Sequence, residues 1–175
     1  MAVSSLSLLT VFVLGGTGEV GRELVHALAA NQSISKVVLI GRRIQELDGE
    51  QYTKVEQIVI DFDKIENYAH VFEGFDAGYC CLGTTRAKSG KEGFVRVDRD
   101  YVLESAKLAK QGGCKHFHLV SSQGANKDSW FLYPQTKGQI EAEVSALEFN
   151  RFSIYRPALL LCERKVNSFQ FCFFS

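Results

Sequence analysis

Hydrophobic residues along this chain fall into two alternating patterns. In the first, short runs of Val, Ile, Leu and Phe are bounded by Gly, Asp or Pro, as is typical of buried strands. In the second, apolar residues recur three and four positions apart, as is typical of helices. The predicted strands are 10–14, 36–41, 55–60, 77–82, 117–120 and 152–155. The predicted helices are 19–30, 65–72, 94–111 and 133–147.

The regular alternation of strands and helices predicts the fold class. Strands that are continuously apolar belong to parallel sheets, because the helices that connect them cover both faces. We therefore expect an α/β fold with a doubly wound, mostly parallel sheet. On the last helix we expect Glu141, Glu143 and Glu148 to form a solvated face.

Composition narrows the classes of function. The chain has 175 residues, 46% of them hydrophobic, which suits one folded domain. Its 20 basic and 20 acidic residues cancel, so nucleic acid is not expected as a main partner. The five cysteines and four histidines lack metal-ligand spacing, so we expect no metal, and the odd number of cysteines favours a reducing compartment. No apolar run reaches roughly 18 residues, so no membrane span is expected.

A glycine-rich turn follows the first predicted strand and opens the first helix. Glycines allow a tight turn and a close approach to a pyrophosphate, and the free amides at the helix start then hold its charge. Gly21 allows the helix to pack against the strand. The position of the turn between a strand and a helix favours dinucleotide binding over a plain tight turn. Its residues are Gly15, Gly16, Thr17, Gly18, Glu19, Val20 and Gly21.

Two arginines, Arg42 and Arg43, follow the second strand. Proteins that bind NAD usually place an acidic residue here, about 20 residues beyond the glycine turn, for the ribose 2′-hydroxyl. A guanidinium instead matches a phosphate in charge and geometry. The pair therefore predicts NADP(H), with a solvated basic turn as the alternative.

Other strand ends supply further candidates for the cofactor site. Asp61 either accepts a hydrogen bond from the adenine amino group or caps the following helix. Leu82 and Gly83 end the fourth strand, where the loops of such sheets line the cofactor crevice. An ordinary loop is the alternative there.

Tyr133 and Lys137 form a Tyr-x-x-x-Lys pair at the start of the last helix. Residues four apart share a helix face, so the ammonium can lower the high pKa of the phenol and suit it to acid–base work. The same lysine can bind the nicotinamide ribose. Ser121 and Ser122 end the fifth strand, where a hydroxyl can hold a substrate carbonyl, although serine pairs also simply form turns.

The order of these motifs resembles the short-chain dehydrogenase/reductase superfamily, in particular its extended or atypical branch. Three longer strings look like the Tat-interactive oxidoreductase family, and the resemblance covers roughly residues 10 to 164. These strings are CCLGTTR at 80–86, GFVRVDRDYV at 93–102 and GGCKHF at 112–117.

The resemblance implies a Rossmann-like fold with bound NADPH, and Ser122 or Ser121, Tyr133 and Lys137 as the catalytic set. It implies a cytoplasmic location with some nuclear presence, and association with tumour suppression, apoptosis and nuclear-import factors. The cofactor contacts that it implies are Thr17, Gly18, Glu19, Val20, Arg42, Arg43, Leu82 and Gly83.

Two features depart from this family. Asp98 stands where many extended members carry Asn. After Arg164 the resemblance disappears, and four of the 13 phenylalanines fall within the last seven residues. We therefore expect an NAD(P)-binding domain at 1–164 with an incomplete substrate lobe, and a divergent tail at 165–175 of a truncated or alternatively spliced form. A tail that packs as one short element is the alternative.

Three functions follow from this reading. The first is an NADPH-dependent oxidoreductase that acts on a carbonyl or alcohol, with Tyr133 as the proton donor or acceptor. The second is an NADPH-sensing regulatory protein with little or no turnover. The third is a truncated isoform of low function. Trp130 and Phe131 either line a substrate site or staple the start of the last helix.

Overall fold

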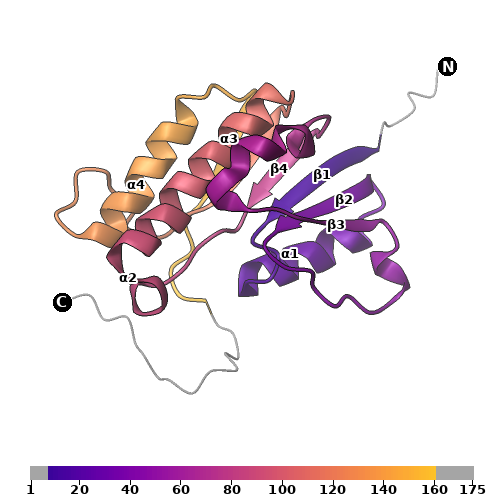
Figure 1. The fold of residues 1–175 in the computed structure, drawn as a ribbon, viewed down its shortest axis with the longest axis horizontal. Coiled ribbons are helices and arrows are strands. Elements are labelled where there is room, and N and C mark those ends of the chain that lie inside the picture. Colours follow the sequence, from indigo (N-terminus) through magenta and orange to yellow (C-terminus); the bar gives the residue numbers. More distant parts are fainter. Residues whose placement is uncertain (1–7, 161–175) are drawn as a thin grey trace.

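Six strands form one sheet in the computed structural model, which describes residues 8–160. The spatial order is β3-β2-β1-β4-β5-β6, and every neighbouring pair is parallel (Figure 1). This is the doubly wound, Rossmann-like order, so the predicted fold class is confirmed. The strands are β1 (Leu9–Leu14), β2 (Ile34–Gly41), β3 (Val55–Val59), β4 (Ala77–Cys80), β5 (His116–Val120) and β6 (Arg151–Tyr155).

The helices agree with the prediction at both ends of the chain and differ in the middle. The helix predicted at 65–72 is a longer 3₁₀ segment with non-helical residues inside it, and the single helix predicted at 94–111 is divided by a π-helical segment. The α-helices are α1 (Glu19–Ala30), α2 (Arg86–Val95), α3 (Tyr101–Gln111) and α4 (Leu132–Ser145). The other helical segments are η1 (Glu50–Tyr52), η2 (Phe62–Phe72) and η3 (Arg96–Asp100).

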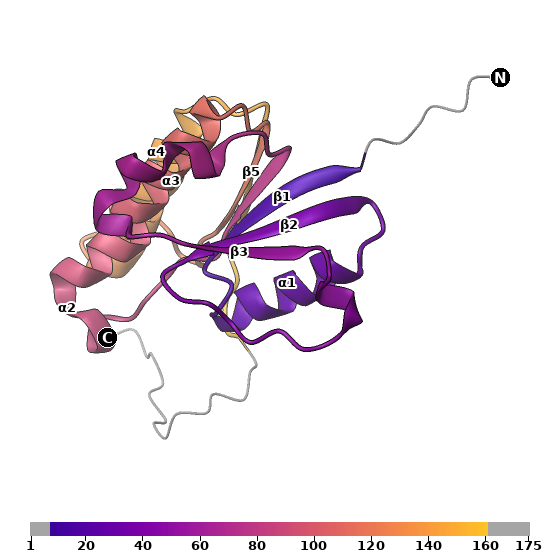
Figure 2. The ribbon, with the colours of Figure 1, turned by 45° about the vertical axis from the view of Figure 1, so that its right-hand side comes forward.

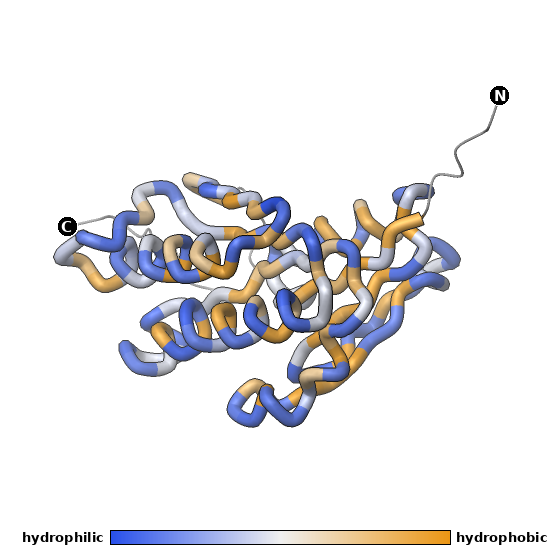
Figure 3. Tube along the Cα trace, turned by 90° about the horizontal axis from the view of Figure 1, so that it is seen from above, coloured by the Kyte–Doolittle hydropathy of each residue, from blue (hydrophilic) through white to orange (hydrophobic). Residues whose placement is uncertain are grey.

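The two faces of the sheet are covered by different helices. Figure 2 shows α1 on one face and α3 and α4 on the other. Consecutive β1 residues alternate between these faces, so Val11 and Val13 pack with the α1 cluster while Phe12 and Leu14 enter the other core. Because both faces are buried here, the strand is continuously apolar in sequence, and Figure 3 shows hydrophobic segments along the middle of the molecule.

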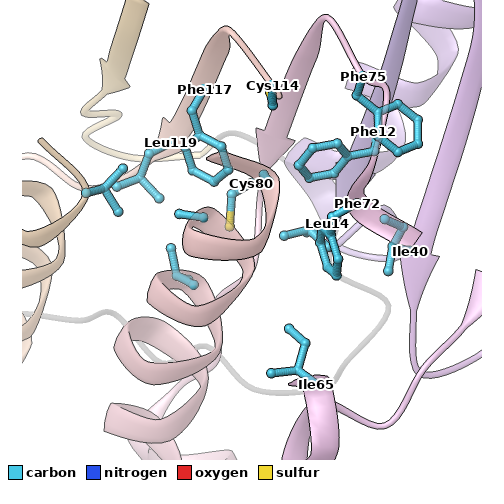
Figure 4. Close-up of a cluster of buried hydrophobic side chains, with 14 of the residues drawn as sticks. Phe12, Leu14, Ile40, Ile65, Phe72, Phe75, Cys80, Cys114, Phe117 and Leu119 are labelled. Carbon is cyan, nitrogen blue, oxygen red and sulfur yellow. The ribbon is translucent and has the colours of Figure 1, made fainter. Parts of the chain in front are cut away.

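The larger core lies between the sheet and the α3–α4 layer (Figure 4). Phe12 is at its centre and makes edge-on contacts with Phe72 and Phe75, with ring centroids 5.6 and 5.2 Å apart. Phe117 from β5 lies 6.4 Å away on the other side. This aromatic cluster joins the two halves of the sheet.

The α1 side of β4, β5 and β6 is different, because it carries a row of polar aromatic rings. The His118 ring stacks on Tyr79 at 4.4 Å and lies 6.0 Å from Tyr155. Its Nδ1 is 3.2 Å from the Tyr155 hydroxyl, and Tyr155 is half exposed. These three residues are called the aromatic row below.

Several further expectations can be compared with the described residues. Glu141 was expected on a solvated face, but it is buried and held by Arg156 at 2.6 and 3.0 Å, because β6 brings that guanidinium against α4. Trp130 is 99% exposed and therefore does not staple α4. Within residues 8–160 no His, Cys, Asp and Glu group fits a metal ion, and no helix has the length and apolar character to cross a membrane. The end of the predicted 1–164 domain and the 165–175 tail lie outside the described residues.

Candidate functional site

The glycine-rich turn has the geometry that close approach to a phosphate requires. Gly15 has a φ of 76°, and a β-carbon there would lie 2.5 Å from the carbonyl oxygen of Cys81. A β-carbon on Gly21 would collide with the Gly15 carbonyl oxygen, so this glycine lets α1 pack against the turn. Both positions therefore need glycine for steric reasons.

The start of α1 is open to a ligand. Gly18 is the N-cap residue, and no side chain of residues 8–160 accepts a hydrogen bond from the first amides of the helix. Those amides and the helix dipole favour an anion at this position. Thr17, Gly18 and Glu19 are exposed around the opening, while Val20 is half-buried.

Arg42 and Arg43 are exposed directly after β2, the strand next to β1. Among residues 8–160 neither guanidinium has a carboxylate within 4.0 Å. The segment after the pair is held in place because Gln57 pairs its side-chain amide with the backbone of Gln45 at 2.8 and 2.9 Å. The two arginines are therefore placed beside the turn with their charges uncompensated.

For Asp61, the structure favours the capping alternative. This residue is the N-cap of η2, and its Oδ1 accepts a hydrogen bond from the amide of Asp63 at 3.0 Å. The carboxylate is exposed and lies after β3. A contact with the adenine amino group stays a prediction.

The loop after β4 is tied to the centre of the molecule by a buried carboxylate. The amide of Thr84, next to Leu82 and Gly83, donates to Asp98 Oδ2 at 2.8 Å. The other oxygen, Oδ1, lies 2.7 Å from Lys137 Nζ, and the two side chains are only 2% and 7% exposed. Burial raises the pKa of the Asp98 carboxyl, while Lys137 and the Thr84 amide act in the opposite direction.

Tyr133 lies in the first turn of α4, one turn before Lys137. Its ring stacks on the fully buried Phe94, with centroids 5.5 Å apart and an interplanar angle of 25°. The residue is 37% exposed, and its hydroxyl has no hydrogen-bond partner within residues 8–160. A fixed ring with a free hydroxyl is what proton transfer to a bound molecule requires.

The structure distinguishes the two serines after β5. Ser121 is 5% exposed, and its hydroxyl is the one buried side-chain oxygen or nitrogen in the described part of the chain that lacks a hydrogen-bond partner. Ser122 is less buried and already donates to the Gln123 carbonyl at 3.1 Å. An unsatisfied buried hydroxyl costs about 1–3 kcal/mol, so Ser121 is the serine that a bound group would satisfy.

The predicted residues gather at one edge of the sheet. The glycine turn and residues 42–43, 61, 82–83 and 121–122 follow the carboxyl ends of parallel strands, whereas Tyr133 and Lys137 lie on α4, the helix after β5. The strands β1 and β4 are neighbours although they are not consecutive, and their junction is the switch point where ligands bind in such sheets. The contact in this region that the sequence did not predict is the ion pair of Asp98 with Lys137, 39 positions later in the chain. The family resemblance, which expects Asn at position 98, was the signal available for it.

Comparison with known families agrees with this geometry. The profile of the family described as NAD(P)H-binding matches residues 15–161. The chain belongs to the NAD(P)H-binding family. This assignment covers the glycine turn, both strand-end serines and the Tyr133–Lys137 pair.

Among relatives of this NAD(P)H-binding chain, rat protein HTATIP2 is 56% identical over 156 residues, which are 89% of this chain and 64% of the rat protein. The resemblance to the Tat-interactive family is thus confirmed, and the chain spans less than two thirds of that relative. The mitochondrial protein FMP52-1 of Scheffersomyces stipitis is 35% identical over 164 residues, which cover 91% of this chain and 70% of the yeast protein.

Solved structures show the same fold at low identity. A putative NAD-dependent epimerase/dehydratase from Bacillus halodurans has a TM-score of 0.72 at 23% identity, over 89% of this chain and 73% of that one. MoeE5 in complex with UDP-glucuronic acid and NAD has a TM-score of 0.68 at 17% identity, over 84% and 54%. These likenesses support the NAD(P)H-binding fold and nothing finer.

Proposed function

We propose that this chain is an NADPH-dependent oxidoreductase of the short-chain dehydrogenase/reductase type, acting on a carbonyl or an alcohol. The observation that carries the proposal is the Tyr133 hydroxyl, which has no hydrogen-bond partner among residues 8–160 and lies one turn before Lys137 on α4, the helix that follows β5 and Ser121. The free hydroxyl of Tyr133 and the buried, unpartnered hydroxyl of Ser121 both suit a bound substrate oxygen.

The residues present fit the cofactor. The open amides at the start of α1 would hold the pyrophosphate, and the Gly15 turn lets it approach the backbone. Arg42 and Arg43 would pair with the 2′-phosphate of NADPH, and Leu82 and Gly83 would line the crevice. When bound, NADPH supplies the hydride.

Each catalytic side chain has a separate task. The Ser121 hydroxyl donates a hydrogen bond to the substrate oxygen and fixes its position. The Tyr133 hydroxyl gives its proton to that oxygen in reduction and takes it back in oxidation. The Lys137 ammonium stabilises the tyrosinate that is left and donates to a ribose hydroxyl.

The proton-transfer role predicts the behaviour of Tyr133→Phe. The substitution keeps the ring on Phe94 but removes the hydroxyl, so we expect turnover to fall by roughly 10²–10⁴-fold across a panel of aldehydes, ketones and alcohols. NADPH affinity, measured by calorimetry, is expected to stay close to that of the unaltered chain. Tyr68→Phe is the matched control. Full turnover in Tyr133→Phe, or loss of its NADPH binding, would contradict the assigned role.

The choice of NADPH over NADH is tested by thermal melting. A cofactor at 100 times its dissociation constant adds about 2.7 kcal/mol of stability, so a clear shift is expected with NADPH and a smaller one with NADH. Arg42→Ala combined with Arg43→Ala should abolish that preference, whereas Lys64→Ala should keep it. Equal shifts for both cofactors in the unaltered chain would rule out the role of the arginines.

A second candidate is an NADPH-sensing protein whose cofactor occupancy controls a protein partner. It is favoured by the fully exposed indole of Trp130, three positions before Tyr133, and by the similarity to HTATIP2. A nuclear-import factor is the partner implied by the family resemblance, with a cytoplasmic and nuclear location. Binding of that factor that requires NADPH and Trp130, without turnover across the substrate panel, would establish this function in place of the first.

A further inference from the structure

The strand β6 leaves one of its two edges open. It is the last strand of the sheet, and within residues 8–160 it pairs with no strand except β5. The Arg151 amide donates to the Lys115 carbonyl at 3.1 Å, and the Tyr155 carbonyl accepts a hydrogen bond from the Ser121 amide at 2.7 Å. Arg151 and Tyr155 therefore use these backbone groups toward β5. An open strand edge is a template on which a further strand can pair.

Phe152 and Ile154 direct their backbone groups to the open edge, because the bonding direction alternates along a strand. No loop or side chain of residues 8–160 bonds to their amides or carbonyls. Phe152 packs against the larger core, whereas Ile154 is 37% exposed. On the other face of the strand, the exposed Arg151 and the half-exposed Tyr155 lie on either side of Ser153. The edge therefore combines unused hydrogen-bonding groups with exposed apolar surface.

The sequence of β6 is complementary to a second, antiparallel copy of itself. A two-fold axis at Ser153 pairs the whole strand, and it places Arg151 opposite Tyr155 of the second copy. It also places Phe152 opposite Ile154 of the second copy, and residues in such pairs exchange both of their backbone N–H···O bonds. The open groups of the edge are satisfied in this register.

The side chains favour the same register. No carboxylate of residues 8–160 lies within 4.0 Å of the Arg151 guanidinium. Opposite the half-exposed ring of Tyr155 in the second copy, this cation gains a cation–π contact. On the other face, the apolar side chains of Phe152 and Ile154 meet across the strands. Because one strand supplies both members of each pair, a second copy of this chain fits the edge.

We propose that two copies of this chain associate edge to edge through β6, so that one sheet runs through both copies. The inference goes beyond the proposed function and does not depend on it. A contact between two strands of 5 residues is narrow compared with the interfaces of stable dimers, so we expect a dissociation constant on the order of 10 µM. The opposite edge of the sheet, β3, takes no part in this contact.

The first test is sedimentation equilibrium of the full chain over roughly 1–100 µM, where the unaltered chain should shift from one copy to two. Ile154→Pro should raise the dissociation constant about tenfold or more, because proline donates no hydrogen bond and its ring obstructs the open edge. Val59→Pro is the matched control, since this exposed residue ends the other edge strand and the next residue, Ile60, makes the bond to β2. It should change the constant less than about twofold. Thermal melts establish that both variants fold.

A second measurement tests the register and needs no proline. Ser153→Cys places a thiol on the two-fold axis, in a pair without backbone hydrogen bonds, where β-carbons lie about 4.5–5.5 Å apart and a disulfide can form with a small adjustment. Mild oxidation should give a covalent dimer whose disulfide joins position 153 of the two copies, identified by peptide mass spectrometry. Val59→Cys, at the β3 edge, should give no disulfide at its position. The unaltered chain shows the background from its five cysteines.

Monomers throughout the concentration range would overturn the proposal and assign the edge to another occupant, residues 161–175 or a different protein. A dimer that Ile154→Pro leaves intact, or a dimer that forms no disulfide in Ser153→Cys, would also overturn it. If Ile154→Pro does not fold, the cross-link at position 153 decides alone. None of these measurements involves NADPH, so failure of this proposal leaves the proposed function unaffected.

Discussion

The two halves of the sheet are built from the same kind of strand but lie in different surroundings. In β1, Val11, Phe12, Val13 and Leu14 are all 0% exposed, because helical elements cover both faces. In β5 the α3–α4 face is buried in the same way, through Phe117 and Leu119, whereas no residue of β6 is fully buried. The opposite face of these strands carries the aromatic row, where Tyr155 is 51% exposed.

The deeply buried half of the sheet contributes most to stability, whereas the more exposed half lies beside the residues of the proposed chemistry. The buried residues 11–14 of β1 lead directly into the glycine turn, so the proposed phosphate site follows the most deeply buried strand. The residues proposed for proton transfer follow β5 and open α4, in the half of the sheet that the described residues cover on one face.

The largest expected effect is the difference between Phe12→Ala and Tyr155→Ala in the free energy of unfolding. Phe12 is fully buried among three other aromatic rings, so its truncation should lower the free energy of unfolding by about 3–5 kcal/mol. Tyr155 is half exposed, so its truncation should cost less than about 1.5 kcal/mol. Urea denaturation followed by circular dichroism measures both. Similar losses for the two variants would show that the halves are equally enclosed.

A smaller effect is expected from Gly138→Ala on α4. A β-carbon at this position would collide with the backbone of Asn126 and Lys127, in the loop that follows the serine pair. Overpacking against backbone costs about 1–3 kcal/mol, because neither element can move freely. Gln139→Ala, the next residue along the helix, should change stability by less than about 0.5 kcal/mol. If Gly138→Ala left the free energy of unfolding unchanged, the loop at Asn126 and Lys127 would shift easily to make room for the added methyl group.

The smallest effect concerns pH and the aromatic row. Burial lowers the pKa of the His118 imidazole, with smaller contributions in the same direction from His116 and Arg151. The folded state therefore binds this proton less readily than the unfolded chain, so stability present above about pH 6.5 is lost as the pH falls below it. His118→Gln should flatten that slope in melts between pH 7 and 5, whereas His70→Gln should keep it. An unchanged slope in His118→Gln would assign the loss to other groups.

Local sequence signals were enough for most of the fold. The range of α1 agrees with the prediction residue for residue, because helical spacing and the glycines before it mark its start without ambiguity. The cofactor turn was predictable for the same reason. Arg42, Arg43 and Ser121 could be placed at strand ends because each directly follows an apolar run that predicts a strand of a parallel sheet.

The remaining differences arise from contacts between distant segments. The spacing of residues within one segment does not predict that Glu141 on α4 pairs with Arg156, which directly follows β6. It equally does not predict that Asp98 in η3 pairs with Lys137 on α4. The predicted helix 94–111 is interrupted at η3, the π-helical segment that contains the buried Asp98. In each case a buried carboxylate pairs with a cation from another segment, so neither segment alone contains both partners.

The parallel order of the sheet also has a kinetic consequence. Within residues 8–160 every pair of neighbouring strands is parallel, so none pairs through a local hairpin. Long loops must close before these strands can pair, which makes such folds slow to assemble. On the ribosome the chain emerges from its N-terminus, and the β1–α1–β2 unit is complete well before the Tyr133–Lys137 helix is made. The nascent protein therefore completes the glycine turn and its flanking elements before the helix proposed for proton transfer.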